Sequence, residues 1–315
     1  MANIITSPRY FKNKAILLKA EVPVGTDAVP TGAANWFEAR NVQITPLDAQ
    51  TVDRNIDQPY FGNGGSIMVA QYCKISFELA VAGSGTPGDA PKLAPALLAC
   101  AFAETLNAGT DAVYNLVSSS IGAATLYINI DGTLHKMIGS RGTAGWRLAA
   151  GAIPVFTFEF DAAFVDPAAV SLPAVVKTGW QVEEPVNAVN TTKLTLAGVD
   201  CAWSAFEISL NNQLGRIDLP GPQREVAITD RKPSGSVTVL AAGLATLDPF
   251  NLAKTATAVV LSTTHGSAAG NQVKFDVKAR IKGAAYDTVE GMLGYRLDLE
   301  PVPVDGNDEI AITFQ

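Results

Sequence analysis

Three residues in one short stretch carry the side chains of a hydrolase triad. Asp131, His135 and Ser140 could in principle orient a base, move a proton and attack a carbonyl group. The Asp131-Gly132 dipeptide, however, is a strong signal for a tight hairpin turn, and the sequence lacks the Gly-x-Ser-x-Gly motif of a nucleophile elbow. The pattern therefore predicts a β-hairpin with a surface histidine, and we expect no catalytic residues.

The glycine-rich segment 83–88 is a second candidate, because it fits the GxGxxG pattern of dinucleotide-binding loops. The strand expected before it alternates apolar and polar residues, as antiparallel strands do, whereas a dinucleotide fold needs a buried parallel strand. Pro87 also lacks the backbone N–H that a pyrophosphate would bind. We interpret the segment as a flexible loop and expect no cofactor.

Metal-binding and glycosidase chemistry are disfavoured as well. The two histidines, His135 and His265, lie in unrelated segments, and the three cysteines form no C-x-x-C pair, so a zinc site is not expected. Adjacent acids such as Glu183 and Glu184 point to opposite faces of a strand and cannot flank one substrate. No run of ~18 apolar residues predicts membrane insertion.

The composition is that of a folded, mainly β protein. The 315 residues are 48% hydrophobic, enough for a sizeable core, and 27 glycines and 18 prolines favour many short strands joined by turns. Only 17% of the residues are charged, and the net charge is −7. An acidic chain is a poor binder of phosphates, and a sparsely charged surface is often buried against copies of itself.

Strict alternation of apolar and polar residues predicts antiparallel strands at 75–81, 156–160, 273–281 and 293–299. Shorter strands are expected at 42–44, 125–130, 206–210, 225–229 and 236–240. Two short helices are also expected. Segment 91–102 has apolar residues at helical spacing, and segment 248–254 opens with an Asp N-cap and a proline at its first position.

The order of these elements repeats along the chain. Residues 158–161, Phe-Glu-Phe-Asp, match residues 297–300, Leu-Asp-Leu-Glu, and the strands before the two helices match at a spacing of about 160 residues. We therefore predict a first domain at 1–166, a linker at 167–190 and a second domain at 191–315.

Two long connections join strands that are expected to be neighbours, at 47–66 and 212–223. Hairpin connections of this length are usually functional, and both carry side chains of the kinds enriched at interfaces. The candidate contacts are Arg54, Asp57, Tyr60, Phe61, Arg216 and Asp218. The N-terminal segment 2–11 is a further candidate arm.

Segments spread over nearly the whole chain resemble the tail tube (major tail) proteins of long-tailed bacteriophages. They are residues 15–21, 25–32, 45–54, 58–62, 76–85, 97–105, 129–136 and 228–239. Their order carries the resemblance, and segments 63–65 and 180–186 depart from it.

The resemblance implies tandem β-sandwich or half-barrel domains, each with one short flanking helix. It implies that two-domain members form homotrimeric rings with pseudo-sixfold symmetry, and that the rings stack into a tube. The tube then carries double-stranded DNA into the host without binding it specifically. Tail terminator, distal tail and tape-measure proteins are the implied partners, in a virion tail assembled in the host cytoplasm.

A DNA conduit needs a wall that does not bind phosphates, and an acidic strand face would repel the duplex within about 8 Å at ~0.15 M salt. The alternating strands could supply such a lumen-facing wall. The candidates are Glu78, Glu159, Asp161, Glu207, Asp298 and Glu300. A β-sandwich module that binds carbohydrates or surfaces is the alternative function, although the four tryptophans are scattered and form no aromatic platform.

Overall fold

The computed structural model describes residues 8–191 and 193–315, and this part of the chain is mainly β. The predicted 2–11 arm lies largely outside the described residues. The N-terminal half contains β1 (Lys14–Ala20), β2 (Arg40–Asp53), β3 (Ser66–Ala80), α1 (Ala94–Leu98), β4 (Phe102–Asn107), β5 (Asp111–Leu116), β6 (Ala124–Ile130), β7 (Thr133–Ala149), β8 (Val155–Ala163) and β9 (Ala168–Ala169). The C-terminal half contains β10 (Leu194–Leu196), β11 (Val199–Cys201), β12 (Trp203–Ser209), β13 (Asn212–Asp218), β14 (Arg224–Arg231), β15 (Ser234–Leu240), α2 (Pro249–Thr255), β16 (Ala258–His265), β17 (Val273–Val289), β18 (Met292–Pro301) and β19 (Ile310–Phe314).

The pairing order of the strands is the same in both halves. The N-terminal half pairs in the order β2-β3-β8-β7-β6-β1. The C-terminal half pairs in the order β12-β15-β18-β17-β16-β10. β7 and β17 each change partners at an irregularity, between Ile138 and Arg141 and between Ile281 and Gly283. Such bulges bend a strand, so each of these two strands passes from one sheet into the next.

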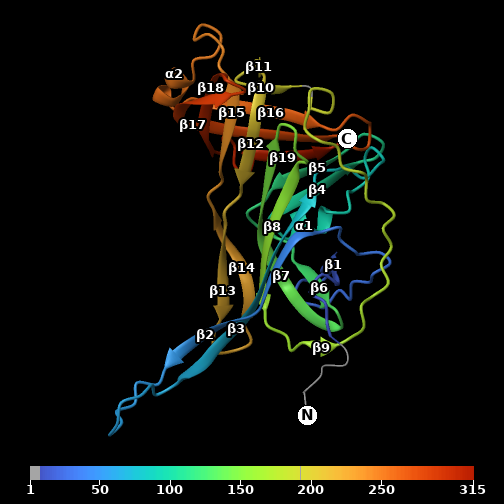
Figure 1. Ribbon diagram of the computed structural model, residues 1–315, viewed down its shortest axis with the longest axis vertical. Helices are drawn as coiled ribbons and strands as arrows, with labels where there is room; N and C mark the ends of the chain where they lie inside the picture. Colours follow the sequence, from blue (N-terminus) through green and yellow to red (C-terminus); the bar gives the residue numbers. More distant parts are fainter. Residues whose placement is uncertain (1–7, 192) are drawn as a thin grey trace.

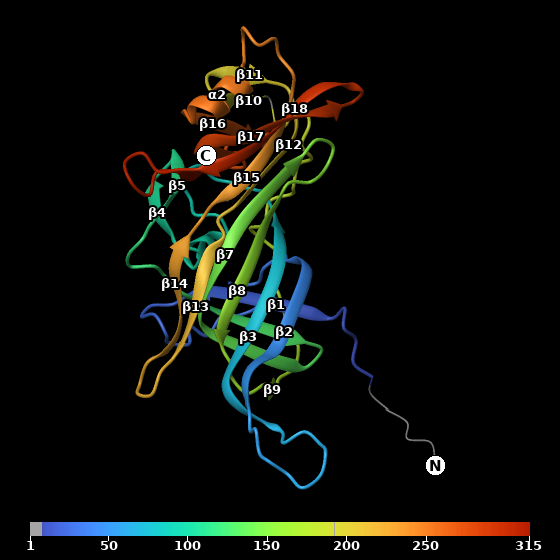
Figure 2. The ribbon, with the colours of Figure 1, turned by 90° about the vertical axis from the view of Figure 1, so that its left-hand side faces the viewer.

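The two halves meet edge to edge. β7 pairs with β12 over Gly145–Ala149, and β5 pairs with β19. The first of these pairings makes one continuous sheet, β2-β3-β8-β7-β12-β15-β18-β17, which we call the joined sheet. Figure 2 shows its strands side by side across the face of the molecule.

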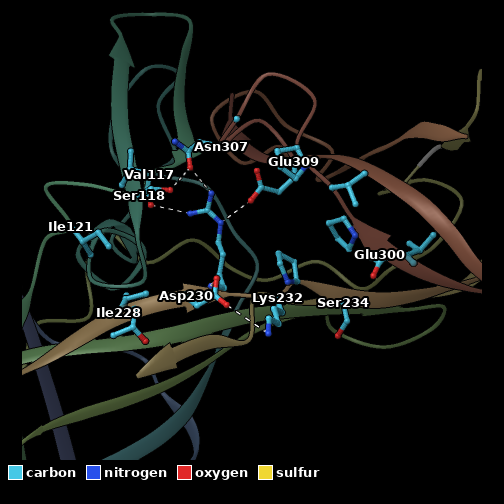
Figure 3. Close-up of a pocket in the computed structure, with 18 of the residues that line it drawn as sticks. Val117, Ser118, Ile121, Ile228, Asp230, Lys232, Ser234, Glu300, Asn307 and Glu309 are labelled. Atoms are coloured by element: carbon cyan, nitrogen blue, oxygen red, sulfur yellow. Dashed lines mark hydrogen bonds and ion pairs between the residues drawn. The ribbon is translucent and has the colours of Figure 1, made fainter. Parts of the chain in front are cut away.

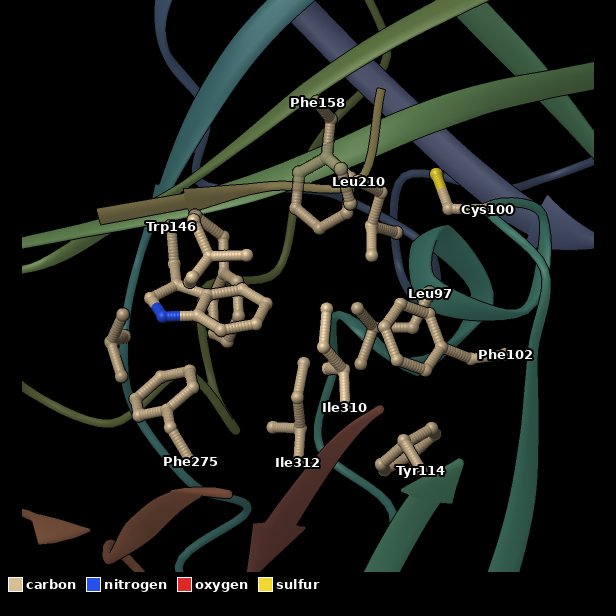
Figure 4. Close-up of a cluster of buried hydrophobic side chains, with 14 of the residues drawn as sticks. Leu97, Cys100, Phe102, Tyr114, Trp146, Phe158, Leu210, Phe275, Ile310 and Ile312 are labelled. Carbon is tan, nitrogen blue, oxygen red and sulfur yellow. The ribbon is translucent and has the colours of Figure 1, made fainter. Parts of the chain in front are cut away.

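One face of the joined sheet is apolar and forms a core that both halves share. Trp146 of β7 stacks on Phe275 of β17 with ring centroids 5.0 Å apart, and it also meets Phe206 of β12 edge-on. Figure 4 shows this cluster, in which Ile310 and Ile312 of β19 lie near Tyr114 of β5. The alternation read from the sequence is thus the alternation between this core and a polar face. The boundaries at 166 and 190 stay a prediction, and the core is continuous across them.

The helices differ in how well the sequence predicted them. α2 is confirmed, and the Asp248 side chain accepts a hydrogen bond from the backbone N–H of Asn251 at 2.9 Å as an N-cap. The first helix is much shorter than the expected 91–102. It ends at Leu98, and after a turn in which Ala101 has a left-handed backbone (φ 68°) the chain continues as β4.

Two hairpins leave the joined sheet. β2 and β3 continue past the core as a long ribbon that projects away from the body of the molecule (Figure 1). β13 and β14 form a separate two-stranded hairpin that lies against the N-terminal half, over β7 and β8 (Figures 1 and 2). In the pairing order of each half, the first two strands are β2 and β3, or β12 and β15. Each hairpin lies between these two strands along the chain, so the two hairpins have the same place in the repeated order.

Candidate assembly surfaces

The projecting part of the β2–β3 ribbon, residues 47–69, which we call the arm, exposes a continuous apolar surface. Tyr60 is 70% exposed and Phe61 at its tip is fully exposed. Val52, Ile67 and Met68 on its strands are each more than half exposed, and the predicted contacts at positions 54 and 57 are exposed too. Large exposed apolar patches on a folded chain mark sites of interaction. The arm is therefore the strongest candidate contact surface in the described residues.

The sequence reasoning missed the apolar residues on the strands of the arm. Ile67, Met68 and Val69 are all exposed, and Val69 is 62% exposed. The run Ile-Met-Val-Ala breaks the alternation that follows it from Lys74 onward. An apolar run without a polar face would have indicated a strand that is buried on both sides in some assembly.

The β13–β14 hairpin is attached to the N-terminal half by Arg216. Its guanidinium pairs with Asp161 at 2.9 Å and with Asp48 at 2.7 Å, and it lies over the Tyr72 ring at 4.7 Å. A contact between Arg216 and another ring was expected, but here only 19% of its side chain is exposed. Asp218, also expected at such a contact, is partly exposed and lies 3.7 Å from Arg224.

Further contacts fix the same hairpin. Arg141 donates to the backbone oxygen of Val226 at 2.8 Å and pairs with Glu225 at 3.2 Å. Asn212 donates to the backbone oxygens of Gly142 and Cys100, both at 3.0 Å. The hairpin thus covers one end of the polar face of the joined sheet.

All six acidic residues predicted to face the lumen lie on this polar face. Directly opposite residues of antiparallel strands share a face. Each of these acids has a polar residue directly opposite it on the adjacent strand. The pairs that establish this are Glu78–Thr157, Ser76–Glu159, Lys74–Asp161, Glu207–Ser236, Ser236–Asp298 and Arg280–Glu300. That the face lines a lumen stays a prediction.

Two findings modify the expected acidic wall. Asp161 is only 4% exposed, because the β13–β14 hairpin covers it, so in this chain it does not stand on an open surface. Burial raises the pKa of its carboxyl group, against the opposing attraction of Arg216. The face also carries basic side chains, and Glu159 pairs with Lys74. Five further bases lie on the face, at Arg40, Arg141, Arg147, Arg280 and Arg296.

The residues weighed for catalysis do not form a triad. Asp131 and Gly132 have φ values of 43° and 95° in the β6–β7 turn, which confirms the predicted hairpin. Asp131 accepts from the backbone N–H of Tyr10 at 2.5 Å, and Ser140 is buried and donates to the Met137 oxygen at 3.2 Å.

The glycine-rich segment is packed rather than flexible, so that expectation was wrong. The Gly83 N–H donates to the Asn271 side chain at 2.8 Å, and the Gly85 N–H donates to the Gly270 oxygen at 2.9 Å. A Cβ at Gly83 would lie 2.1 Å from that Gly270 oxygen. The glycines therefore allow two backbones to approach closely, and they join the two halves of the chain.

A cavity of about 820 Å³ opens beside the joined sheet, between the C-terminal half and segment 117–121 of the N-terminal half (Figure 3). Arg231 spans its wall and donates to Glu309 at 2.7 Å, to Asn307 at 2.6 Å and to the Val117 backbone oxygen at 2.9 Å. Glu309 is 2% exposed, and its Oε2 atom has no hydrogen-bond partner among the described residues. Hydrogen bonds of Arg231 thus hold this wall together, while one buried carboxylate oxygen in it lacks a hydrogen-bond partner in the described part of the chain.

Repeated β units with open sheet edges and a projecting apolar arm are features of a structural protein that contacts other chains. Residues 12–315 match the family model of the phage tail tube protein, so the chain belongs to the phage tail tube family. It is therefore a structural protein of the virion tail, as the sequence resemblance implied. A search of curated proteins finds no match. Within the described residues, no helix is long and apolar enough to cross a membrane.

Proposed function

We propose that three copies of this chain close into a ring with pseudo-sixfold symmetry, and that these rings stack into the tube through which genomic DNA passes. The repeated strand order supports this, because each chain supplies two equivalent β units and three chains supply six. The chain acts through assembly and carries no catalytic role. Tail terminator, distal tail and tape-measure proteins are its partners in the tail, and assembly takes place in the host cytoplasm.

The two edges of the joined sheet support ring closure. Among the described residues, β2 pairs only with β3, and β17 beyond Ile281 pairs only with β18. Long open edges are usually covered in native proteins. Within the chain, the edge strand β7 of the first half pairs with the edge strand β12 of the second. In a ring, β17 of one copy would pair with β2 of the next in the same way, which leaves no open edge.

The arm tip supports stacking. Tyr60 and Phe61 extend beyond the body of the chain, together with Arg54 and Asp57. Buried aromatic side chains contribute strongly at interfaces. In the proposed tube, these four residues contact the neighbouring ring.

The polar face supports a bore of low affinity for DNA. In a closed ring with the shared core facing outward, Glu78, Glu159, Glu207 and Asp298 would line the bore. Each charge would recur around the ring by symmetry. The bases on this face, of which Lys74 pairs with Glu159, are about as many as the acids, so the wall would carry little net charge and would attract a phosphate backbone only weakly.

Negative-stain electron microscopy of the purified chain tests this proposal. We expect rings or tubes with a central opening, which form without nucleic acid. Compact monomers under all conditions, with binding to glycans, would support the alternative of a surface-binding β-sandwich module instead.

A further inference from the structure

Equivalent positions in the two halves carry the same charged pair. On β7 and β8, Arg141 stands opposite Asp161. On β17 and β18, Arg280 stands opposite Glu300. Both pairs lie next to the irregularity where β7 or β17 bends, Arg141 after it and Arg280 before it. The spacing that relates residues 158–161 to 297–300 also relates Arg141 to Arg280, so the two pairs are at matching positions of the repeat.

In the N-terminal half this site is covered from within the chain. The β13–β14 hairpin lies over it, with Arg216 on Asp161 and Glu225 on Arg141. Val226 and Leu214 of the hairpin pack on Tyr72 of β3. The hairpin leaves its own half directly after β12, the strand that pairs with β7.

In the C-terminal half, the described residues leave the equivalent site open. Glu300, Arg280 and Lys282 are exposed, and the cavity of about 820 Å³ lies there, between β17, β18 and the β14–β15 connection. The unpartnered Oε2 atom of Glu309 belongs to its buried wall. Figure 3 shows Glu300 and Lys232 on one side of this space and Glu309 on the other.

We propose that this cavity is the seat of the strand part of the arm, residues 47–53 and 66–69, of the adjacent copy in the same ring, while the arm tip reaches the neighbouring ring. This inference rests on the proposed function, since it needs β17 of one copy to pair with β2 of the next. The arm continues from β2 beyond the irregularity between Thr45 and Asp48, as β13–β14 follows β12. Once the edges pair, the arm of the neighbour lies over β17 and β18 as the internal hairpin lies over β7 and β8.

The chemistry of the arm fits this seat. Val52, Ile67 and Met68 are exposed in the single chain and would be buried by a wall that contains Ile121, Ile228 and Val302. Acidic side chains outnumber basic ones along the arm, and they would face Lys232 and Lys282 at the mouth of the cavity. The chain's own arm cannot reach the cavity, because β2 and β17 are at opposite ends of the joined sheet.

A cysteine cross-link tests the seat. The variant M68C/K282C carries one cysteine on the arm and one at the mouth of the cavity, and the native cysteines are all buried. Assembled tubes are treated with a short bis-maleimide and analysed on a denaturing gel. The matched control is M68C/V260C, because Val260 is exposed on β16, outside the cavity.

We expect covalent species that stop at three chains for M68C/K282C and none for the control. Cross-links that continue beyond three chains would place the arm in another ring and overturn the inference. Tubes that form but yield no specific cross-link would overturn it too, while the proposed tube function stands. If the unmodified chain forms neither rings nor tubes, the proposed function fails and the inference fails with it.

Discussion

Asp161 on β8 and Glu300 on β18 occupy equivalent positions in the two halves of the chain, yet the first is buried and the second is exposed. The β13–β14 hairpin makes the difference, because it places Arg216 on Asp161, and among the described residues no equivalent hairpin covers Glu300. In the N-terminal half a hairpin of the same chain covers this acidic position. In the C-terminal half the equivalent position is uncovered, and in the proposed ring a second copy covers it.

The Arg216 contact predicts a large effect of a single substitution. Arg216→Ala removes the cation that neutralises Asp161, which is 4% exposed, and also the packing on Tyr72. We expect a loss of about 3 kcal/mol in the free energy of unfolding, since an uncompensated buried charge remains. Denaturant unfolding measures the change. Arg224→Ala is the control, because Arg224 is exposed and makes only a long 3.7 Å pair with Asp218 and one hydrogen bond to the Gln71 backbone oxygen at 3.1 Å. A loss of the same size there would contradict the account.

The arm tip predicts a separation of folding from assembly. Tyr60→Ser with Phe61→Ser removes two exposed aromatic side chains that make no described contact in the core. We expect an unchanged thermal midpoint and at least a tenfold loss of tube length or yield, because the loss of one good aromatic anchor costs about 1.4 kcal/mol or more. Electron microscopy and light scattering measure the tubes. Tubes of normal length would contradict the proposal that these residues mediate stacking.

The polar face predicts an effect on DNA passage alone. Glu207→Lys with Asp298→Lys reverses two exposed charges near the centre of the joined sheet and leaves the core intact. We expect tubes of normal appearance, slower DNA delivery by phage that carry the variant, and new, salt-sensitive binding of duplex DNA to purified tubes. Unchanged delivery together with no DNA binding would place these residues outside the bore.

His265 predicts a pH dependence of stability. The ring is 1% exposed and its Nδ1 atom lies 2.7 Å from the Thr191 hydroxyl; burial lowers the pKa of His265 below its ordinary value of 6.5, against the opposing influence of Glu184. The unfolded chain therefore takes up a proton near pH 6.5, while the folded chain does so only at lower pH. The contribution of neutral His265 to stability is complete above pH 6.5 and declines as the pH falls towards the folded-state pKa.

The measurement is the thermal midpoint of the native chain and of His265→Gln between about pH 7.5 and about pH 5. We expect the native chain to lose stability on acidification and the variant to lose less. His135→Gln is the comparison, because that ring is only partly buried and should change the slope less. Identical slopes for the native chain and His265→Gln would contradict the assignment.

Strands and helices could be predicted well from the sequence, whereas contacts between residues far apart in the chain could not. Period-two alternation located β3, β8, β17 and β18, and the Asp248 cap located α2, because these signals depend on neighbouring residues. The burial of Asp161 under Arg216 could not be read in this way. It depends on a hairpin whose Arg216 follows 55 residues later and which folds back over the other half of the chain. In its local sequence, neither residue differs from a solvated charge. The projecting arm was predicted from the length of its loop, whereas its exposed strand residues 67–69 were not.

The central claim is that two equivalent β units in one chain supply two of the six positions of a ring. Cryo-electron microscopy of assembled tubes, with the number of chains in each ring counted from the density, tests it most directly. The account predicts three chains per ring, with β17 of each copy hydrogen-bonded to β2 of the next around a continuous inner sheet. Six chains per ring, or three chains whose β2 and β17 edges remain apart, would contradict it.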